Sequence, residues 1–281
     1  MAKRAVLVGV NRYLIPGADL RGCVNDVRNM QKMLVDLYGF RPRDIAILLD
    51  AKATKRNIQA AVRQMIKASA AGDVALFHFS GHGSNVPDKD GDEADYRDEI
   101  LCPHDLDWRA PLTDDWLRTS FDRLKRDVNL TCIFDCCHSG TATRQLAAPD
   151  APAIARYLPS PWDLVAAESR RRLRGKVRAT VHRAPAARRR RSDVVVADMP
   201  EVLISGCRDT QTSADAYIGN SFNGALTYNL VAALRDARGN ITYRDLHAKV
   251  LQRLKRGRFD QVPQLEGRRT ALERPFLSAA D

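Results

Sequence analysis

Two short stretches of the sequence place a thiol and an imidazole shortly after apolar runs that are typical of strands. Cys137 follows the run 130–134, and His82 follows the run 74–77. Ligands of α/β sheets bind beyond the carboxyl ends of the strands, so residues at neighbouring strand ends can meet in one crevice. A cysteine thiolate is a nucleophile, and a histidine beside it can protonate a leaving amine. We therefore expect Cys137 and His82 to form a catalytic pair.

Two glycines flank this histidine. Gly81 and Gly83 leave space for a substrate backbone, and their turn offers N–H groups of the kind that stabilise an oxyanion. His78 lies inside the preceding apolar stretch, and we expect it to be a core or supporting histidine rather than a ligand.

Strand parity predicts which side chains share the crevice with the catalytic pair. Side chains two apart on a strand point to the same face, so Asp135 is expected beside Cys137 and Ser80 beside His82. A carboxylate next to the nucleophile can bind a cationic substrate residue. Cys136 then faces the core, where free cysteines commonly lie.

Apolar periodicity predicts the elements that must position these residues. Strands are expected near residues 4–10, 45–49, 74–77, 130–134 and 202–207, with a last short one near 269–277. Helices are expected near residues 27–37, 54–72, 116–124, 224–234 and 243–254. Strands that alternate with helices are typical of a mostly parallel central sheet with helices on both faces. The predicted fold class is therefore α/β.

Length and composition favour one domain over residues 1–281, because 44% of the chain is hydrophobic, enough for a substantial core. The segment 145–200 differs in kind, being rich in Arg, Ala and Pro with few long apolar runs. We interpret it as an inserted loop that is helical in part near 162–173.

The net charge of +11 belongs to one stretch of that segment. Residues from Arg170 to Arg191 include eleven Lys or Arg and no Asp or Glu, and the other 34 basic residues balance 34 acidic ones. No aromatic residue lies between these arginines, so the stacking surface that binds single-stranded nucleic acid is missing. We do not expect nucleic acid as a partner.

Cysteine usage and hydropathy indicate the compartment. Six cysteines in a chain of this length fit free thiols in a reducing environment. No apolar stretch approaches the ~18 residues of a membrane span, and the run 5–10 is too short for a secretory signal. We expect a cytoplasmic monomer without a membrane span.

Several blocks of sequence follow one another in a characteristic order. They are LRGCVND at 20–26, HFSGHG at 78–83, DCCHSG at 135–140, ISGCRD at 204–209 and GALT at 224–227. Together they resemble the metacaspases of the bacterial type, which are caspase-like cysteine peptidases. The resemblance covers most of the chain outside 145–200.

The resemblance implies the caspase-like α/β fold and a Cys–His dyad of Cys137 and His82 that cleaves proteins and peptides after Arg or Lys. It also assigns three further residues a role in binding the substrate. Asp26, Ser80 and Asp135 match the family's pocket for the basic residue.

Calcium activation is a further implication of the resemblance. Asp98, Asp114 and Asp115 match three acidic positions of the family's calcium site, but Arg144 or its neighbours stand where a fourth ligand is expected. Fewer carboxylates and a nearby cation weaken a calcium site. The acidic run 88–92 resembles the start of an EF-hand with its glycine misplaced, so we interpret it as a solvated loop.

Other interpretations of the same residues stay open. Zinc could be held by Cys136, Cys137, His138 and His82, although no Cys-x-x-Cys spacing supports it. An enzyme with an acidic pocket would find the arginines of residues 170–191 a substrate in its own chain, which predicts self-processing there. The rival classes are a non-catalytic caspase-like module that binds nucleic acid or acidic partners, and a clostripain-like or legumain-like protease.

Overall fold

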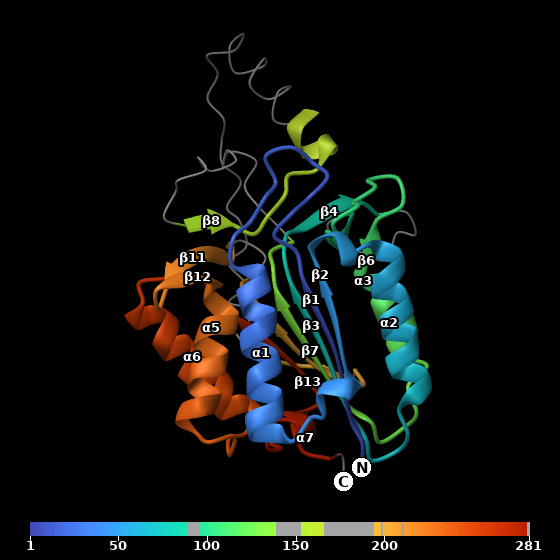
Figure 1. Cartoon of the computed structure of the whole chain (residues 1–281), viewed down its shortest axis with the longest axis vertical. Helices are drawn as coiled ribbons and strands as arrows, with labels where there is room; N and C mark the ends of the chain where they lie inside the picture. The colour runs from blue at the N-terminus through green and yellow to red at the C-terminus, as the bar shows by residue number, and fades with distance from the viewer. Residues whose placement is uncertain (89–95, 139–152, 166–193, 198, 209–210, 280–281) are drawn as a thin grey trace.

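The computed structural model describes residues 1–88, 96–138, 153–165, 194–197, 199–208 and 211–279. Helices cover both faces of a central sheet, and the first residue of the chain lies at the lower edge of that sheet in the view of Figure 1. This arrangement is the α/β class that the alternation of strands and helices predicts.

The central sheet is mostly parallel. Its seven strands, in sheet order, are β2 (Ile45–Leu49), β1 (Lys3–Gly9), β3 (Val74–Ser80), β7 (Asn129–Asp135), β10 (Glu201–Ser205), β13 (Gln264–Gly267) and β9 (Val194–Val196). All neighbours pair in parallel except β10 and β13. Every residue of β3 and β7 is buried, as expected for adjacent central strands covered on both faces.

Helices pack on the two faces of this sheet in separate groups. One face carries α1 (Cys23–Tyr38), α5 (Ala225–Asp236) and α6 (Tyr243–Arg256), and the other carries α2 (Lys55–Ala68) and α3 (Asp114–Phe121) (Figure 1). Each face of the sheet has its own hydrophobic core, because successive side chains of a strand point to opposite faces. Leu7 packs in the core on the side of α1, α5 and α6, and Val8 packs in the core on the side of α2 and α3. The carboxyl ends of β3 and β7 are thereby held from both sides.

Local sequence signals fix the ends of these helices. Thr54, Thr113 and Thr242 each accept a backbone N–H of the first turn with the side chain, which satisfies a donor that the helix leaves unpaired. Gly39 ends α1 at a φ of 66°, a left-handed conformation that glycine adopts without a steric penalty.

Two smaller sheets lie beyond the carboxyl ends of the central strands. The first contains β4 (Gly83–Pro87), β5 (Arg97–Leu101) and β6 (Leu112–Thr113), paired antiparallel in that order. The second contains β12 (Ser221–Gly224), β11 (Ala214–Ile218) and β8 (Ala153–Ala155), also antiparallel. Short helical segments are η1 (Pro42–Asp44), η2 (Asp50–Lys52), residues 161–165 and α7 (Arg269–Leu272).

Two sequence-based expectations differ from the structure. The segment 145–200, expected to be a loop, contributes β8 and β9, and its expected helix extends over residues 161–165 before the described residues end. The last strand is Gln264–Gly267 rather than 269–277. Leu272, Phe276 and Leu277 bury their side chains in the α6 side of the core from α7 and the turn that follows it, so their apolar pattern reflects packing and not strand pairing. Among the described residues, no helix is both long and apolar enough to cross a membrane.

Candidate functional site

The site lies where β3 and β7 end side by side. Ser80 and Asp135 are paired in the parallel register of these strands, and His82 and Cys137 follow two residues later on each chain segment. Gly83 packs directly on the Cys137 backbone, where a β-carbon would collide with its carbonyl oxygen. The sheet therefore brings the imidazole and thiol segments together at one edge, as the sequence predicts.

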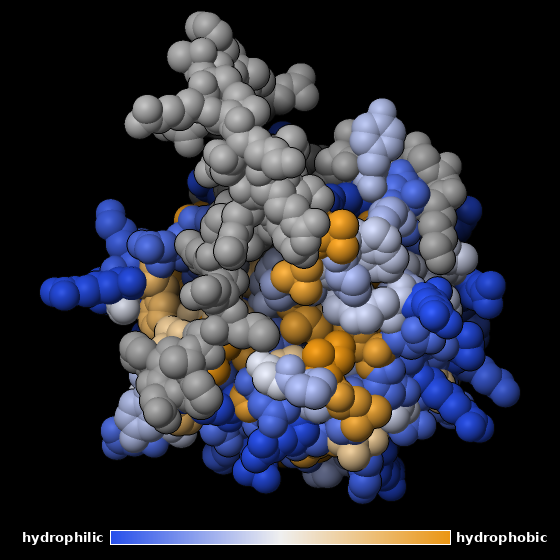
Figure 2. All heavy atoms as spheres, turned by 90° about the horizontal axis from the view of Figure 1, so that it is seen from above, coloured by the Kyte–Doolittle hydropathy of each residue, from blue (hydrophilic) through white to orange (hydrophobic). Residues whose placement is uncertain are grey.

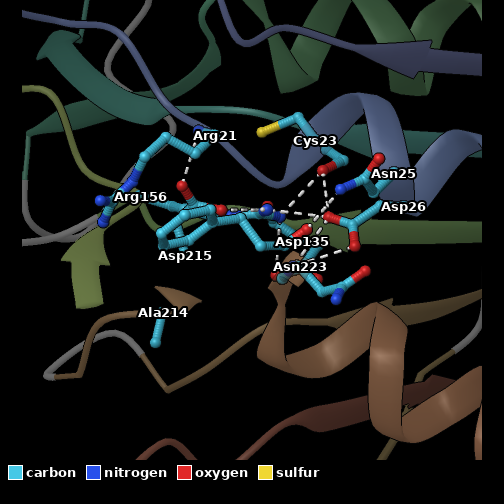
Figure 3. Close-up of polar contacts among 12 residues, drawn as sticks. Arg21, Cys23, Asn25, Asp26, Asp135, Arg156, Ala214, Asp215 and Asn223 are labelled. Atoms are coloured by element: carbon cyan, nitrogen blue, oxygen red, sulfur yellow. Dashed lines mark hydrogen bonds and ion pairs between the residues drawn. The ribbon is translucent and has the colours of Figure 1, made fainter. Parts of the chain in front are cut away.

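An arginine of the same chain fills the pocket beside this pair. The Arg156 side chain is 0% exposed, and its guanidinium forms ion pairs with Asp26 at 2.8 Å, Asp215 at 3.1 Å and Asp135 at 3.3 Å. These carboxylates come from α1, β11 and the end of β7 and surround the cation; Figure 3 draws the polar contacts among them. The three residues Asp26, Ser80 and Asp135 are thus brought together around a basic side chain.

Further hydrogen bonds define the shape of this pocket. Ser80 Oγ accepts a 2.8 Å hydrogen bond from Arg156 Nη1 and donates a 2.7 Å bond to Asp26. The floor is Gly224, whose N–H donates to Asp26. A β-carbon on Gly224 would collide with the Asp135 carboxylate and with the guanidinium. The pocket is therefore sized to a flat guanidinium group.

The charged groups of the pocket are buried, so their pKa values depend strongly on one another. Burial raises the pKa of Asp26 to about 6, although Arg156 lowers it and Asp135 raises it further. Carboxylates buried together destabilise one another's ionised form unless a cation is present. Burial lowers the pKa of Arg156, but its acidic neighbours raise it well above the ordinary value. The pocket is a cation site by its electrostatics.

The backbone around Arg156 runs through the site as an extended strand. The Arg156 carbonyl oxygen accepts hydrogen bonds from the backbone N–H of Gly83 at 3.0 Å and of Cys137 at 3.1 Å. Before it, β8 pairs with β11, and the Arg156 N–H donates to Ser213 O at 2.9 Å. After it, the Leu158 N–H donates to Gly83 O at 3.0 Å. Two backbone donors that converge on one carbonyl oxygen form an oxyanion-binding arrangement.

The imidazole of His82 is oriented by the N-terminal loop. Its Nε2 lies 2.8 Å from the carbonyl oxygen of Ala18, so Nε2 carries the proton and Nδ1 is left as the basic nitrogen. Nδ1 is buried without a hydrogen-bond partner. Burial lowers the pKa of His82 to about 4, while the carbonyls of Ala18 and Arg156 act in the opposite direction. A neutral imidazole beside the Arg156 carbonyl can accept a proton.

The Cys137 thiol is buried against the loop before β11. Its sulfur accepts a hydrogen bond from the Ser213 N–H and lies 3.8 Å from Ser213 O. Burial raises its pKa well above the ordinary value, and a hydrogen bond with Cys207 adds to this. The thiol therefore stays protonated while the segment around Arg156 covers it. The neighbouring Cys136 packs in the core on the α2 and α3 side, as predicted.

Sequence reasoning missed three members of the site. Asp215 and Ser213 lie in and just before the short strand β11, and Arg156 follows β8; none of these elements shows strong apolar periodicity. Ser213 Oγ donates a 2.6 Å hydrogen bond to Asp135, which orients that carboxylate. The available signal for Arg156 was weak, because it is one of many arginines in the segment 145–200. His78 is buried at 3.2 Å from Thr227 Oγ1, in the supporting position expected for it.

The residues matched to a calcium site lie at the β5 and β6 sheet. Asp98 is buried on β5, and Asp114 and Asp115 open α3 directly after β6. Burial and the charge of Glu99 raise the pKa of Asp114 to about 7. Within the described residues no group of three or more His, Cys, Asp or Glu is arranged to hold a metal ion. Arg144, and most of the acidic run 88–92, lie outside the described residues.

The face above the strand ends carries exposed apolar side chains. Leu14, Leu164 and Val165 are 69%, 56% and 66% exposed. Figure 2 views the molecule from this end and shows apolar side chains gathered near the middle of the face. The face of the molecule at the ends of the central strands is therefore partly apolar.

Comparisons with known proteins agree with this geometry. A sequence profile described as metacaspase, peptidase C14 domain, matches residues 3–145. Metacaspase-1B of Neosartorya fischeri is 33% identical over 286 residues, a match that covers 94% of this chain and 68% of that protein. The crystal structure of a Geobacter sulfurreducens protein is similar at 25% identity with a TM-score of 0.70, covering 100% of both chains. Caspase-1 from Spodoptera frugiperda, at 13% identity and a TM-score of 0.54 over 95% of this chain and 90% of that one, shows the caspase-like fold alone.

Proposed function

Because the chain belongs to the metacaspase family of cysteine peptidases, we propose that it cleaves proteins and peptides after arginine and, less readily, after lysine. The observation that carries this proposal is the position of Arg156, with its side chain among three carboxylates and its carbonyl oxygen on two backbone N–H donors. A peptide bound in this manner presents the bond after its arginine to Cys137.

The proposed reaction uses groups that already surround that carbonyl. His82 Nδ1 takes the thiol proton, and the Cys137 sulfur attacks the carbonyl carbon while the N–H groups of Gly83 and Cys137 hold the oxyanion. The C–N bond then breaks, and the imidazolium gives its proton to the leaving amine. Water hydrolyses the thioester, releasing the carboxylate and restoring the thiol.

The arrangement of acceptors supports a preference for arginine over lysine. The Nη1 atom of Arg156 contacts Ser80 and Asp135, while Nη2 contacts Asp26 and Asp215. A guanidinium spans both groups of acceptors with its fixed fork, whereas an ammonium is a single point of charge. An aspartate substrate would place another carboxylate among those already buried, so cleavage after Asp is disfavoured.

We also propose that the chain processes itself, and that the bond concerned is Arg156–Tyr157. Its carbonyl lies on the oxyanion donors. The arginines of residues 170–191, where cleavage was expected from composition, lie outside the described residues. Arg156 belongs to the same segment 145–200 and is the arginine held by the pocket.

Calcium stimulation remains a proposal. A cation beside Glu99 and Asp114 would relieve the repulsion that contributes to the raised pKa of Asp114. Since the described carboxylates do not form a group that could hold a metal, the fit is incomplete and the reaction above does not depend on the ion.

Free, buried cysteines support our proposal of a reducing, cytoplasmic location, since all six are unpaired by disulfides. We further propose a monomer that acts without nucleic acid. The competing class is a non-catalytic module that binds through residues 170–191. This alternative is tested by a salt-sensitive nucleic-acid binding assay on a protein that lacks residues 170–191. An affinity equal to that of the full chain would rule it out.

Hydrolysis of fluorogenic peptides that end in Arg, Lys or Asp tests the assignment. We expect the order Arg, Lys, Asp for the wild type and no activity for Cys137→Ala. Cys136→Ala is the matched control, because it removes the adjacent thiol from the core, and it should retain activity. Full activity of Cys137→Ala, or an Asp or Asn preference of the wild type, would contradict the proposal.

A further inference from the structure

The chain that follows the Arg156–Tyr157 bond is held by a second polar network. Tyr157 Oη donates a 2.7 Å hydrogen bond to Asp163, and the Tyr157 side chain packs in a buried cluster with Cys137 and Cys207. Asp163 also forms a 2.7 Å ion pair with Arg97 of β5. The two residues on either side of the bond are therefore anchored independently.

A short helical turn presents the carboxylate of this network. Ser160 caps residues 161–165: its Oγ accepts the Asp163 N–H at 3.2 Å, and Asp163 accepts a 2.9 Å bond from the Ser160 hydroxyl. The Asp163 carboxylate also accepts the Ser160 backbone N–H at 3.4 Å, and this reciprocal pair of backbone bonds is a capping box, with Pro161 suited to the first helical position. Trp162 packs edge-on against Trp108 at 6.5 Å between ring centroids. Asp163 is thus fixed in the direction of Arg97.

The network reaches back to the nucleophile segment. Arg97 Nη1 also donates to Asn85, and Asn85 donates a 2.9 Å hydrogen bond to the carbonyl oxygen of His138. His138 follows Cys137 directly. Although burial acts against it, hydrogen bonds from Tyr157, Arg97 and Ser160 lower the pKa of Asp163 below its ordinary value. The Asp163 carboxylate is therefore ionised at neutral pH.

The two anchors differ in their access to solvent. The Arg156 side chain is 0% exposed, whereas that of Arg97 is 37% exposed and that of Asp163 is 11% exposed. Local opening begins where backbone and side chains meet solvent. Of these two anchors, the Asp163–Arg97 pair therefore opens to solvent more readily than the Arg156 pocket.

We propose that Arg97, Tyr157 and Asp163 form a latch that retains the segment 153–163 in the active site, so that release of the latch, and not cleavage of the chain, admits substrates. This inference rests on the proposed arginine pocket. The segment is an inhibitor tethered to its own enzyme.

The latch also determines what cleavage of the Arg156–Tyr157 bond achieves. Attack by Cys137 forms the thioester of Arg156 and frees the Tyr157 amine, which takes the proton from His82. Because the latch keeps that amine in the site, it can attack the thioester again, re-form the peptide bond and return the thiol. Hydrolysis by water gives a cut chain whose two ends both stay bound.

A binding experiment with the full chain in the Cys137→Ala background, where no cleavage occurs, isolates the latch. The probe is fluorescein-labelled Ala-Ile-Ala-Arg amide, the sequence of residues 153–156, followed by fluorescence anisotropy. Asp163→Asn should tighten probe binding about tenfold or more, because it removes a charge-assisted hydrogen bond. Tyr157→Phe should tighten it by a smaller factor and serves as the readout if Asp163→Asn does not fold.

Two further variants in that background separate the possible outcomes. Asp236→Asn removes an ion pair with Arg253 between α5 and α6 and should leave probe affinity unchanged. Arg156→Gln should give the tightest binding. If Arg156→Gln binds the probe tightly while Asp163→Asn and Tyr157→Phe bind it no better than the Cys137→Ala parent, the latch is overturned and the arginine pocket is kept. If Arg156→Gln is folded and still fails to bind the probe, the arginine pocket is overturned and the latch with it.

The active enzyme tests whether cleavage alone is enough. The fraction of chains with a new N-terminus at Tyr157 is measured by mass spectrometry, together with the hydrolysis rate of an arginine substrate. Per cut chain, Asp163→Asn should be about tenfold more active than wild type. Equal activity per cut chain would show that cleavage releases the segment and would overturn the proposal.

Discussion

The molecule holds two groups of acidic side chains that differ in what neutralises them. The pocket group, Asp26, Asp135 and Asp215, encloses the buried guanidinium of Arg156. In the second group, Glu99 and Asp114 lie near each other at β5 and the start of α3, and Asp115 pairs with Arg118, whose side chain is 59% exposed.

Comparison of the two groups shows how burial turns like charges into a binding site. In the pocket, burial raises the pKa of Asp26, and Arg156 compensates with several charge-assisted hydrogen bonds. At α3, burial and Glu99 raise the pKa of Asp114 to about 7, so a proton can neutralise it instead. The first group encloses a guanidinium, whereas the second group is in part neutralised by protonation.

Removal of the cation from the pocket should have the largest effect. We expect Arg156→Gln to lower the free energy of unfolding by about 3–5 kcal/mol at neutral pH, because it removes the cation that pairs with three buried carboxylates. Added arginine amide should restore much of the loss. Urea denaturation with and without that compound provides the measurement.

The control for this change is Arg253→Gln, which removes a partly exposed ion pair with Asp236 and should cost about 1 kcal/mol or less. If both variants lose the same small amount, the pocket carboxylates are neutralised without Arg156 and the comparison fails.

Filling the pocket floor should strongly weaken arginine recognition. Gly224→Ala puts a methyl group against Asp135 and the guanidinium, so kcat/KM for arginine substrates should fall by about 100-fold, or about 3 kcal/mol. Gly257→Ala is the matched control, since its methyl group would meet only the movable Phe259 ring at 3.0 Å and Arg253 O at 3.5 Å. Unchanged arginine hydrolysis by Gly224→Ala would show that substrates bind elsewhere.

The sequence predicts the scaffold better than the occupant of the site. Strong apolar periodicity marks the central strands and large helices, and threonine caps mark helix starts, so these elements lie where expected. β8 and β9 have three residues each, too few for a periodic signal. The apolar residues of 269–277 could fit a strand or a buried turn equally well, and tertiary packing decided between them.

The residues of the candidate site likewise divide into those that local sequence predicts and those that it does not. Asp26, Ser80 and Asp135 lie together because their motifs end or flank core elements. Asp215 and Arg156 reach the pocket through the pairing of β8 with β11, a contact between segments that are 59 residues apart at these two side chains. No local spacing encodes such a contact, so it becomes visible only in the folded chain.

Lowering the pH should weaken cation binding in the pocket before it affects the rest of the site. Because Arg156 lowers the pKa of Asp26, which burial raises to about 6, an empty pocket holds the Asp26 proton more tightly than a filled one. Cation binding therefore releases protons and weakens as the pH falls. In Arg156→Gln, affinity for the labelled arginine peptide should fall about tenfold from about pH 7.5 to about pH 5.5. A citrulline peptide, uncharged and of similar shape, should bind weakly with no such dependence, and parallel curves for the two peptides would contradict the mechanism.

The second acidic group, at β5 and the start of α3, should show a smaller pH effect, in which acid stabilises the protein. The pKa of Asp114 is raised to about 7, chiefly by burial and then by Glu99, so its contribution to stability is present in acid and is lost as the pH rises through about 7. Asp114→Asn should therefore be more stable than wild type above that pH, by on the order of 1 kcal/mol after allowance for solvent screening. The difference should vanish near pH 4, as thermal unfolding across this range would show. Asp115→Asn, which breaks an ion pair with the exposed Arg118, should give no such gain. Calcium sharpens the test: an ion held by this group would stabilise wild type above about pH 7 and leave Asp114→Asn unaffected, whereas equal responses of the two proteins would exclude Asp114 as a ligand.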